Sequence, residues 1–250
     1  MSATPDARRI EELSLNSSAP PGQLLYDGWI LRVLRGKAKR ARSVNAVYPS
    51  TAPLDVKIEY CERLYRAAAL PALFRITPFS EPSGLDATLE RRGYVRFDPT
   101  AVEVAPIDRA LLGEPEAQPM DLSSWVEAVG QLRRSSIAHR SAHLARLQGM
   151  PLAMHAVAVK SQGRVLATGL TILEDGCAGL FDIITADEAR REGHAKRIVA
   201  SLLRTAWELG ARHAYLQVQE DNIAARRLYA RFGFEEKYLY WYRGRPGELE

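Results

Sequence analysis

The chain has 250 residues, 46% of them hydrophobic and 26% charged, and its formal net charge is +4. These values are ordinary for a soluble globular protein with one large domain or two small ones. No apolar run approaches the roughly 20 residues that span a bilayer, and the N-terminus has no apolar signal core. We therefore expect a cytoplasmic protein with no membrane partner. The small positive excess does not by itself indicate nucleic-acid binding, which usually needs a concentrated basic stripe.

The two cysteines, Cys61 and Cys177, lie far apart in the sequence and have no neighbouring cluster of metal ligands. This spacing matches neither a disulfide framework nor a common metal motif. We expect both cysteines to be small buried hydrophobes, and we expect no metal cofactor.

The N-terminal half alternates between strand-like and helical patterns that glycine and proline separate. Strands are predicted at 26–36, 40–49 and 72–77, helices at 53–71 and 83–93, and a strand pair at 94–106. Gly36 is the expected turn between the first two strands, and Asp55 is the expected N-cap of the first helix. The first dozen residues are polar and are expected to fray. The segment 107–120 is rich in Pro, Gly and Glu and is the expected linker.

From about Ser123 the pattern restarts. Helices are predicted at 123–136, 141–148, 194–210 and 222–233, and strands at 152–160, 165–176, 177–185, 213–220 and 234–244. Serines are expected to cap the first of these helices, and Gln162-Gly163 is expected to form a hairpin turn. Each half ends in a helix that stops at a glycine and passes an aromatic residue into a strand. Duplication of one fold and chance recurrence of a common pattern both account for this likeness.

The loop "EARREGHAKR", Glu188 to Arg197, connects a predicted strand to an amphipathic helix. The unpaired backbone N–H groups and the dipole of a helix N-terminus attract anions. Gly193 and Ala195 carry little side chain, so a phosphate could approach the backbone, and Arg190, Arg191, Lys196 and Arg197 add positive charge. Two interpretations stay open: a cradle for a phosphorylated cofactor and a solvated positive loop.

A second motif lies about thirty residues later. "EDNIAARRLYARFGF" places Asn222, Ala225, Leu228 and Tyr229 at helical spacing, and Gly233-Phe234 follows them. Together with the Arg-x-x-Gly-x-Ala loop, this motif resembles the GCN5-related N-acetyltransferase (GNAT) superfamily over about Ile107 to Arg243. The resemblance implies an α/β fold of the α+β type: a mixed, mostly antiparallel, splayed sheet with helices on both faces, expected here in tandem duplicate.

The resemblance also implies acetyl-CoA as the cosubstrate. The backbone of Ile183, Ile184 and Thr185 would hold the pantetheine arm and polarise the thioester carbonyl. The loop would bind the pyrophosphate, and Asn222 would hydrogen-bond the cofactor arm. The loop residues concerned are Arg190, Arg191, Gly193, His194 and Ala195.

Tyr229 matches the family position that protonates the departing thiolate, although a helical tyrosine can also be a simple core residue. The base that takes the amine proton is less defined. Some relatives have a glutamate where this chain has Gln217, which cannot act as a base. Asp182 is the first candidate, Glu220 is the second, and a water relay is a further possibility.

We expect a degenerate GNAT-like domain at 1–106 and a catalytic GNAT domain at 107–250. Aligned on the closing glycine, Leu89 of the first half takes the place of Tyr229, and that half has no Arg-x-x-Gly-x-Gly/Ala loop. It would therefore have a structural role.

Two further segments have competing interpretations. The basic run 36–43, with Lys37, Lys39, Arg40 and Arg42, is expected to point into water, while RNA contact is the alternative. The aromatic residues at 238, 240, 241 and 242 either cover the core or wall an acceptor site.

The sequence thus favours an N-acetyltransferase that moves the acetyl group of acetyl-CoA to a primary amine of an unidentified small molecule or protein. The alternative is a non-catalytic CoA-binding regulatory module. The sequence does not indicate an oligomeric state.

Overall fold

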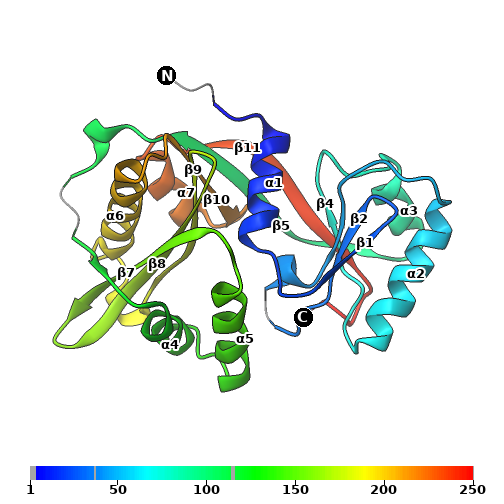
Figure 1. Ribbon diagram of the computed structural model, residues 1–250, viewed down its shortest axis with the longest axis horizontal. Coiled ribbons are helices and arrows are strands. Elements are labelled where there is room, and N and C mark those ends of the chain that lie inside the picture. The colour runs from blue at the N-terminus through cyan, green and yellow to red at the C-terminus, as the bar shows by residue number, and fades with distance from the viewer. Residues whose placement is uncertain (1–3, 37, 114–115, 250) are drawn as a thin grey trace. The chain divides into compact units, whose positions relative to one another are not determined.

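The computed structural model describes residues 4–36, 38–113 and 116–249 (Figure 1). They form two compact units. Unit 1 contains the first 17 residues and Val102–Lys237, and unit 2 contains Ser18–Ala101 and Tyr238–Glu250. The hydrogen-bonded strand order is β1-β2-β3-β4-β11-β5-β10-β9-β8-β7-β6. No helix among the described residues is both long enough and apolar enough to cross a bilayer.

Unit 1 holds the elements of the C-terminal half together with the first helix. Its helices are α1 (Ala7–Ser17), α4 (Leu122–Leu132), α5 (Ile137–Gln148), α6 (His194–Glu208) and α7 (Ile223–Ala230). Its strands are β6 (Gln118–Pro119), β7 (Ala153–Ser161), β8 (Arg164–Glu174), β9 (Cys177–Thr185) and β10 (His213–Gln219), with the end of β5 (Val95–Pro106).

Unit 2 is built from the N-terminal half and the last strand. Its helices are α2 (Leu54–Ala67) and α3 (Leu85–Arg91). Its strands are β1 (Gln23–Tyr26), β2 (Trp29–Arg32), β3 (Val44–Ala46) and β4 (Phe74–Ile76), with most of β11 (Glu235–Gly244). The hairpin turn is at Asp27-Gly28, both at positive φ, rather than at Gly36. The expected strand pair at 94–106 is one strand, β5.

The expected mixed, mostly antiparallel sheet is confirmed. The pairs β3–β4 and β9–β10 run parallel, whereas β1–β2, β2–β3, β4–β11, β6–β7, β7–β8 and β8–β9 run antiparallel. In unit 1, neighbouring residues of β8 face opposite sides of the sheet. A Cβ added to Gly169 would touch Ile198 of α6, while Leu170 packs in the cluster of Trp125 from α4. Helices therefore cover both faces.

One order of elements occurs twice. In the first half it is β1, β2, β3, α2, β4, α3 and β5, and in the second it is β7, β8, β9, α6, β10, α7 and β11. In each case a helix connects two parallel strands, and a helix and a strand follow. This repetition is what duplication of one fold predicts.

The final strands of the two repeats cross between the units: most of β11 belongs to unit 2, and the end of β5 belongs to unit 1. β11 follows the second repeat, but it pairs with β4 of the first, with Trp241 opposite Ile76. β5 follows the first repeat, but it is the neighbour of β10. The compact units therefore depart from chain order, and the division into a degenerate GNAT-like domain at 1–106 and a catalytic domain at 107–250 stays a prediction.

Several helix caps differ from those expected. Asp121, rather than a serine, caps α4 by accepting a hydrogen bond from the Ser124 N–H. Pro53 is the N-cap of α2, and Asp55 lies in the first turn. A carboxylate interacts favourably with the helix dipole both at the N-cap and in the first turn. Asp55 is therefore compatible with a helix that begins at Leu54 as well as with one that begins after Asp55.

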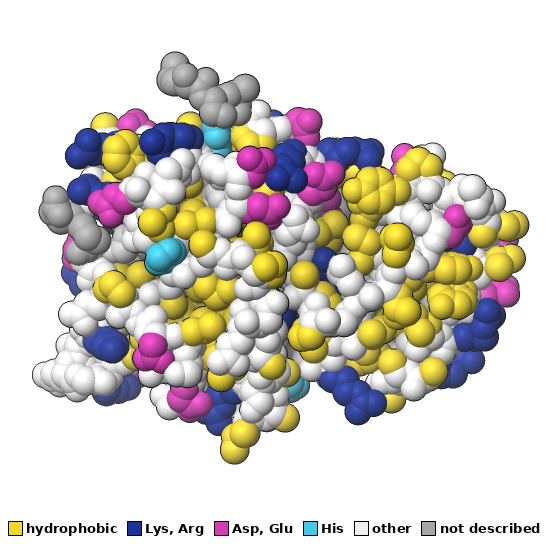
Figure 2. All heavy atoms as spheres, in the orientation of Figure 1, with side chains coloured by type: hydrophobic (Ala, Val, Ile, Leu, Met, Phe, Trp, Pro, Cys, Tyr) yellow, Lys and Arg dark blue, Asp and Glu magenta, His cyan; other side chains and the backbone are white. Residues whose placement is uncertain are grey.

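The basic run does not point wholly into water as expected. Arg42 is buried, and its pKa lies below the usual value because burial disfavours the charge. Lys39 pairs with Asp98 at 3.2 Å, and Lys37 lies outside the described residues. On the face drawn in Figure 2, basic and acidic side chains lie beside one another. The described part of the run is therefore partly built into the fold.

The aromatic side chains of β11 are buried or partly buried and lie on both faces of the strand. Tyr238, Tyr240 and Tyr242 are buried, and Trp241 packs partly buried against the cluster of Trp29 and Phe74. Their alternation along the strand follows the period of two that a strand imposes. Of the two interpretations, the structure favours residues that cover the core.

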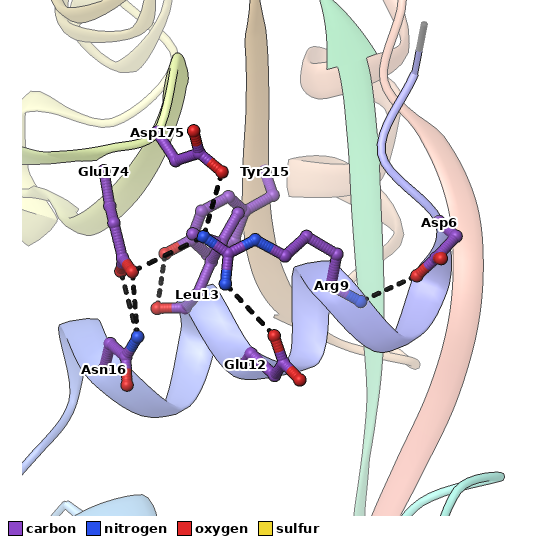
Figure 3. A network of polar contacts seen from close by, with 8 residues as sticks. All are labelled: Asp6, Arg9, Glu12, Leu13, Asn16, Glu174, Asp175 and Tyr215. Carbon is purple, nitrogen blue, oxygen red and sulfur yellow. Dashed lines mark hydrogen bonds and ion pairs between the residues drawn. The ribbon is translucent and has the colours of Figure 1, made fainter.

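The expected fraying of the N-terminus is wrong for α1. Ile10 and Leu13 are fully buried. The Tyr215 hydroxyl donates to the Leu13 carbonyl at 3.0 Å, and Arg9 and Asn16 contact Glu174 (Figure 3). The helix is thus a packed part of unit 1.

Candidate active site

The strands β9 and β10 separate part of the way along their length. Their parallel register runs from Cys177 opposite His213 to Leu180 opposite Leu216. Beyond that point, β9 continues to pair with β8, with Thr185 opposite Ala167. The second half of β9 therefore has a sheet edge that β10 does not cover. Backbone groups on such an edge can bind an extended ligand as a strand would.

A bulge lies where the strands separate. Leu170 pairs with Phe181 and Thr168 pairs with Ile184, so Asp182 and Ile183 oppose the single residue Gly169. Asp182 has a positive φ of 49°. Bulges turn a strand and aim its side chains in a new direction, and they occur often beside active sites. The predicted residues Ile183, Ile184 and Thr185 follow directly on this bent strand.

The predicted phosphate loop leads from β9 into α6. Gly193 is the N-cap of α6 at φ 82°, and no side chain caps the helix there. A Cβ added to Gly193 would meet nothing within 4 Å. The first N–H groups of the helix, which include those of His194 and Ala195, lack intrahelical acceptors. The start of α6 therefore offers donors without a covering side chain.

The charges of this loop are only partly neutralised inside the protein. Arg190 pairs with Asp187 at 2.7 Å, and both side chains are exposed. Arg191, at φ 68°, and Lys196 are exposed. His194 is buried and contacts the Glu192 carboxylate at 3.1 Å. The cations and the helix N-terminus together favour an anion at this corner.

Tyr229 lies on α7 and is 8% exposed. Burial, with a smaller effect from the negative charge of Glu103, raises its pKa to about 12. Glu103 on β5 accepts a hydrogen bond from Arg226 at 2.8 Å. Arg226 lies on α7, about one helical turn before Tyr229. The phenol is therefore protonated throughout the neutral range and can act only as a proton donor there.

Asn222 caps α7, with its side-chain oxygen accepting from the Ala225 N–H at 3.2 Å. This capping role is by itself a sufficient reason for an asparagine at the start of the helix, and it requires no contact with a ligand. Gln217, on β10, donates to the Ser14 hydroxyl of α1, and Glu220 lies in the turn after β10. The amide that replaces the family glutamate is thus occupied by the first helix.

Asp182 contacts two side chains that the sequence reasoning missed. Its Oδ1 lies 2.5 Å from Nη2 of Arg133, which follows α4, and its Oδ2 lies 3.5 Å from Nε2 of His143 on α5. Burial lowers the pKa of His143. The His143 ring also meets Trp125 edge to face at 5.9 Å. No local motif marks these partners, because the contact arises only when the two helices pack over the bulge.

All eleven predicted site residues belong to unit 1. The structure brings Asp182 to Thr185, the loop and the start of α6 into one continuous segment. Asn222 and Tyr229 lie on the helix that follows the neighbouring strand, β10.

Comparisons with known proteins show which family and fold this chain resembles. Residues 125–234 match the family model described as acetyltransferase (GNAT) family. The chain is 28% identical to an uncharacterized N-acetyltransferase, YobR, of Bacillus subtilis, over 95% of this chain and 98% of that protein.

Solved structures show the fold. A GCN5-related N-acetyltransferase from Kribbella flavida superposes with a TM-score of 0.73 and 20% identity, covering 98% of this chain and 97% of that one. A tandem GNAT protein from the clavulanic acid biosynthesis pathway superposes with a TM-score of 0.57 and 13% identity. That match covers 76% of this chain and 69% of the other. Residues 125–234 of this chain thus form a domain of the acetyltransferase (GNAT) family.

Proposed function

We propose that this chain transfers the acetyl group of acetyl-CoA to a primary amine carried by a small molecule or a protein. The observation that supports this most strongly is the uncovered edge of β9, which leads directly to the bare N-terminus of α6. Acetyl-CoA has an extended pantetheine arm that ends in a diphosphate. The strand edge would bind the arm, and the helix N-terminus that follows it would bind the diphosphate.

The residues present fit acetyl-CoA. Backbone groups of Ile183, Ile184 and Thr185 would hold the pantetheine arm along the open edge. The space above Gly193, which a Cβ would enter without touching protein, leaves room for the diphosphate beside the N–H groups of His194 and Ala195. Arg190, Arg191 and Lys196 would supply countercharge. Asn222 would add a hydrogen bond to the arm beyond its role as a cap.

The cosubstrate supplies the acetyl group as a reactive thioester. In the proposed reaction, Tyr229 donates a hydrogen bond and then a proton to the departing sulfur. A thiol has an ordinary pKa near 8.5, so a phenol held protonated by burial is always in the form that can donate.

An alkylamine with a pKa near 10.4 is largely protonated at neutral pH, so it must lose one proton before it attacks and a second as the amide forms. Asp182 lies on the bulge beside the proposed thioester site and stays the first candidate among the predicted residues. Glu220 stays the second. The amide of Gln217 has no basic form, and its contact with Ser14 keeps the non-catalytic CoA-binding module as the alternative function.

A thiol-release assay distinguishes these two functions. The protein is incubated with acetyl-CoA and a panel of primary amines and peptides, and free CoA thiol is measured against time. We expect release above background hydrolysis for at least one amine, in proportion to enzyme concentration. Binding of acetyl-CoA by calorimetry without release for any amine would instead identify the regulatory module.

A further inference from the structure

The side chain of His143 lies against the proposed active site, and the proposed function does not yet use it. It extends from α5 toward the bulge of β9, where its Nε2 is 3.5 Å from Oδ2 of Asp182. Its side chain is 19% exposed, so part of it is accessible to solvent. Asp182 directly precedes the backbone of Ile183 to Thr185, which is the proposed thioester segment.

The geometry points to His143 as the general base of the acetyl transfer, with Asp182 as the residue that orients it. This inference rests on the proposed function and names the group that receives the amine proton. A carboxylate that accepts from one imidazole nitrogen fixes the tautomer and leaves the other nitrogen as the proton acceptor.

The contacts of Asp182 make it a weaker candidate for the base itself. One of its oxygens pairs with Arg133 at 2.5 Å and the other faces His143. A carboxylate engaged on both oxygens loses these interactions when it accepts a proton. An ordinary imidazole is also more basic than an ordinary carboxylate by about 2.6 pKa units, which makes it a better match for an amine.

The surroundings of His143 keep it in the form that a base needs. Burial is the largest effect, and it lowers the pKa of the imidazole below its ordinary value. The carboxylate of Asp182 raises that pKa, whereas the positive charges of Arg146 and Arg133 lower it. At neutral pH the ring is therefore uncharged and able to accept a proton.

The proposed step balances without a further reactant. The ammonium form of the substrate first gives one proton to solvent. The neutral amine nitrogen then forms a bond to the acetyl carbon, and the proton that it loses as the amide forms passes to the free ring nitrogen of His143. The carbon–sulfur bond breaks, and the departing sulfur takes its proton from Tyr229. The products are an N-acetyl amine and CoA thiol. His143 then returns its proton to solvent, from which Tyr229 is reprotonated.

The test measures kcat/KM against pH for the wild type and His143→Gln, using an amine that the thiol-release assay has identified. The wild type should lose activity as pH falls, with a midpoint below about 6.5, because protonated His143 cannot accept a proton. His143→Gln should lower kcat/KM by about 10² to 10⁴ and abolish this acid limb. Its affinity for acetyl-CoA by calorimetry should be unchanged. His155→Gln, an exposed histidine on β7, is the matched control and should behave as the wild type.

Two charge variants test the assignment even if His143→Gln folds poorly. Arg133 is 48% exposed, and Arg133→Gln should move the acid limb to higher pH because a positive charge beside the imidazole is lost. Asp182→Asn should move the limb to lower pH and reduce kcat. The inference would be overturned if the acid limbs of the two variants moved in the same direction or did not move. A His143→Gln variant with wild-type kcat/KM would also overturn it. A wild type that releases no thiol with any amine would instead mean that the proposed function has failed.

Discussion

At the scale of single residues, Tyr229 illustrates how burial determines a chemical role. The centroid of its ring lies 6.0 Å from that of Phe234. Burial raises the pKa of its hydroxyl to about 12. Between the lowered pKa of the His143 imidazole and the pKa of the phenol, the imidazole is neutral while the phenol retains its proton. The acid and the base of the proposed reaction are thus held in complementary protonation states by their surroundings.

Replacement of the Tyr229 hydroxyl should therefore affect turnover more than binding. We expect Tyr229→Phe to lower kcat by about 10² or more while the affinity for acetyl-CoA changes less than about threefold, because the ring and its packing are retained. Steady-state thiol release and calorimetry measure the two effects. Tyr240→Phe, a buried tyrosine of unit 2, serves as the control with nearly normal kcat. Wild-type kcat in Tyr229→Phe would rule out the acid role.

At the scale of secondary-structure elements, the exchange of β5 and β11 is the most consequential feature. Most of β11, which ends the second repeat, lies in the unit of the first, and the end of β5, Val102 to Pro106, lies in the unit of the second. A strand left without its neighbour exposes a row of unpaired backbone groups. Each unit is therefore complete only when both halves of the chain are present.

This exchange predicts how the separate halves behave. The segments 1–106 and 107–250, expressed alone, should be insoluble or lack cooperative unfolding, because β4 lacks β11 and β10 lacks β5. Co-expressed, they should form a soluble 1:1 complex, detectable by size-exclusion chromatography. The full-length chain is the control. A cooperative thermal transition for 1–106 alone would contradict the exchange.

Elements also show which parts of the fold the sequence could predict. The strands and helices from α5 to β11 were predicted closely because strong periodicity, a Gln-Gly turn and terminal glycines mark their limits. Helix α1 was missed because only a few of its residues are apolar, and Leu13 is buried by contact with Tyr215, about 200 positions away. The exchange of β5 and β11 was missed because strand partners are chosen by tertiary contacts.

At the scale of the whole molecule, a repeated fold carries one set of site residues. Leu89, which aligns with Tyr229, is fully buried in the core of unit 2, where it has no group to donate. The two sequence motifs predict the phosphate loop and Tyr229 because the proposed roles require particular residues at fixed spacing. The contacts of His143 and Arg133 with Asp182 depend on how α4 and α5 pack on β9, and a single sequence carries no signal for this.

The central claim is that the exposed amides at the start of α6 bind the diphosphate of acetyl-CoA. Titration calorimetry of the wild type, Gly193→Ala and Gly193→Glu with acetyl-CoA tests it most directly. Both variants carry the same strain of a side chain at positive φ, on the order of 1 kcal/mol, so their difference reports the added bulk and negative charge. We predict that Gly193→Ala retains affinity within about tenfold and that Gly193→Glu abolishes detectable binding. Equal affinities of the two variants would contradict the claim.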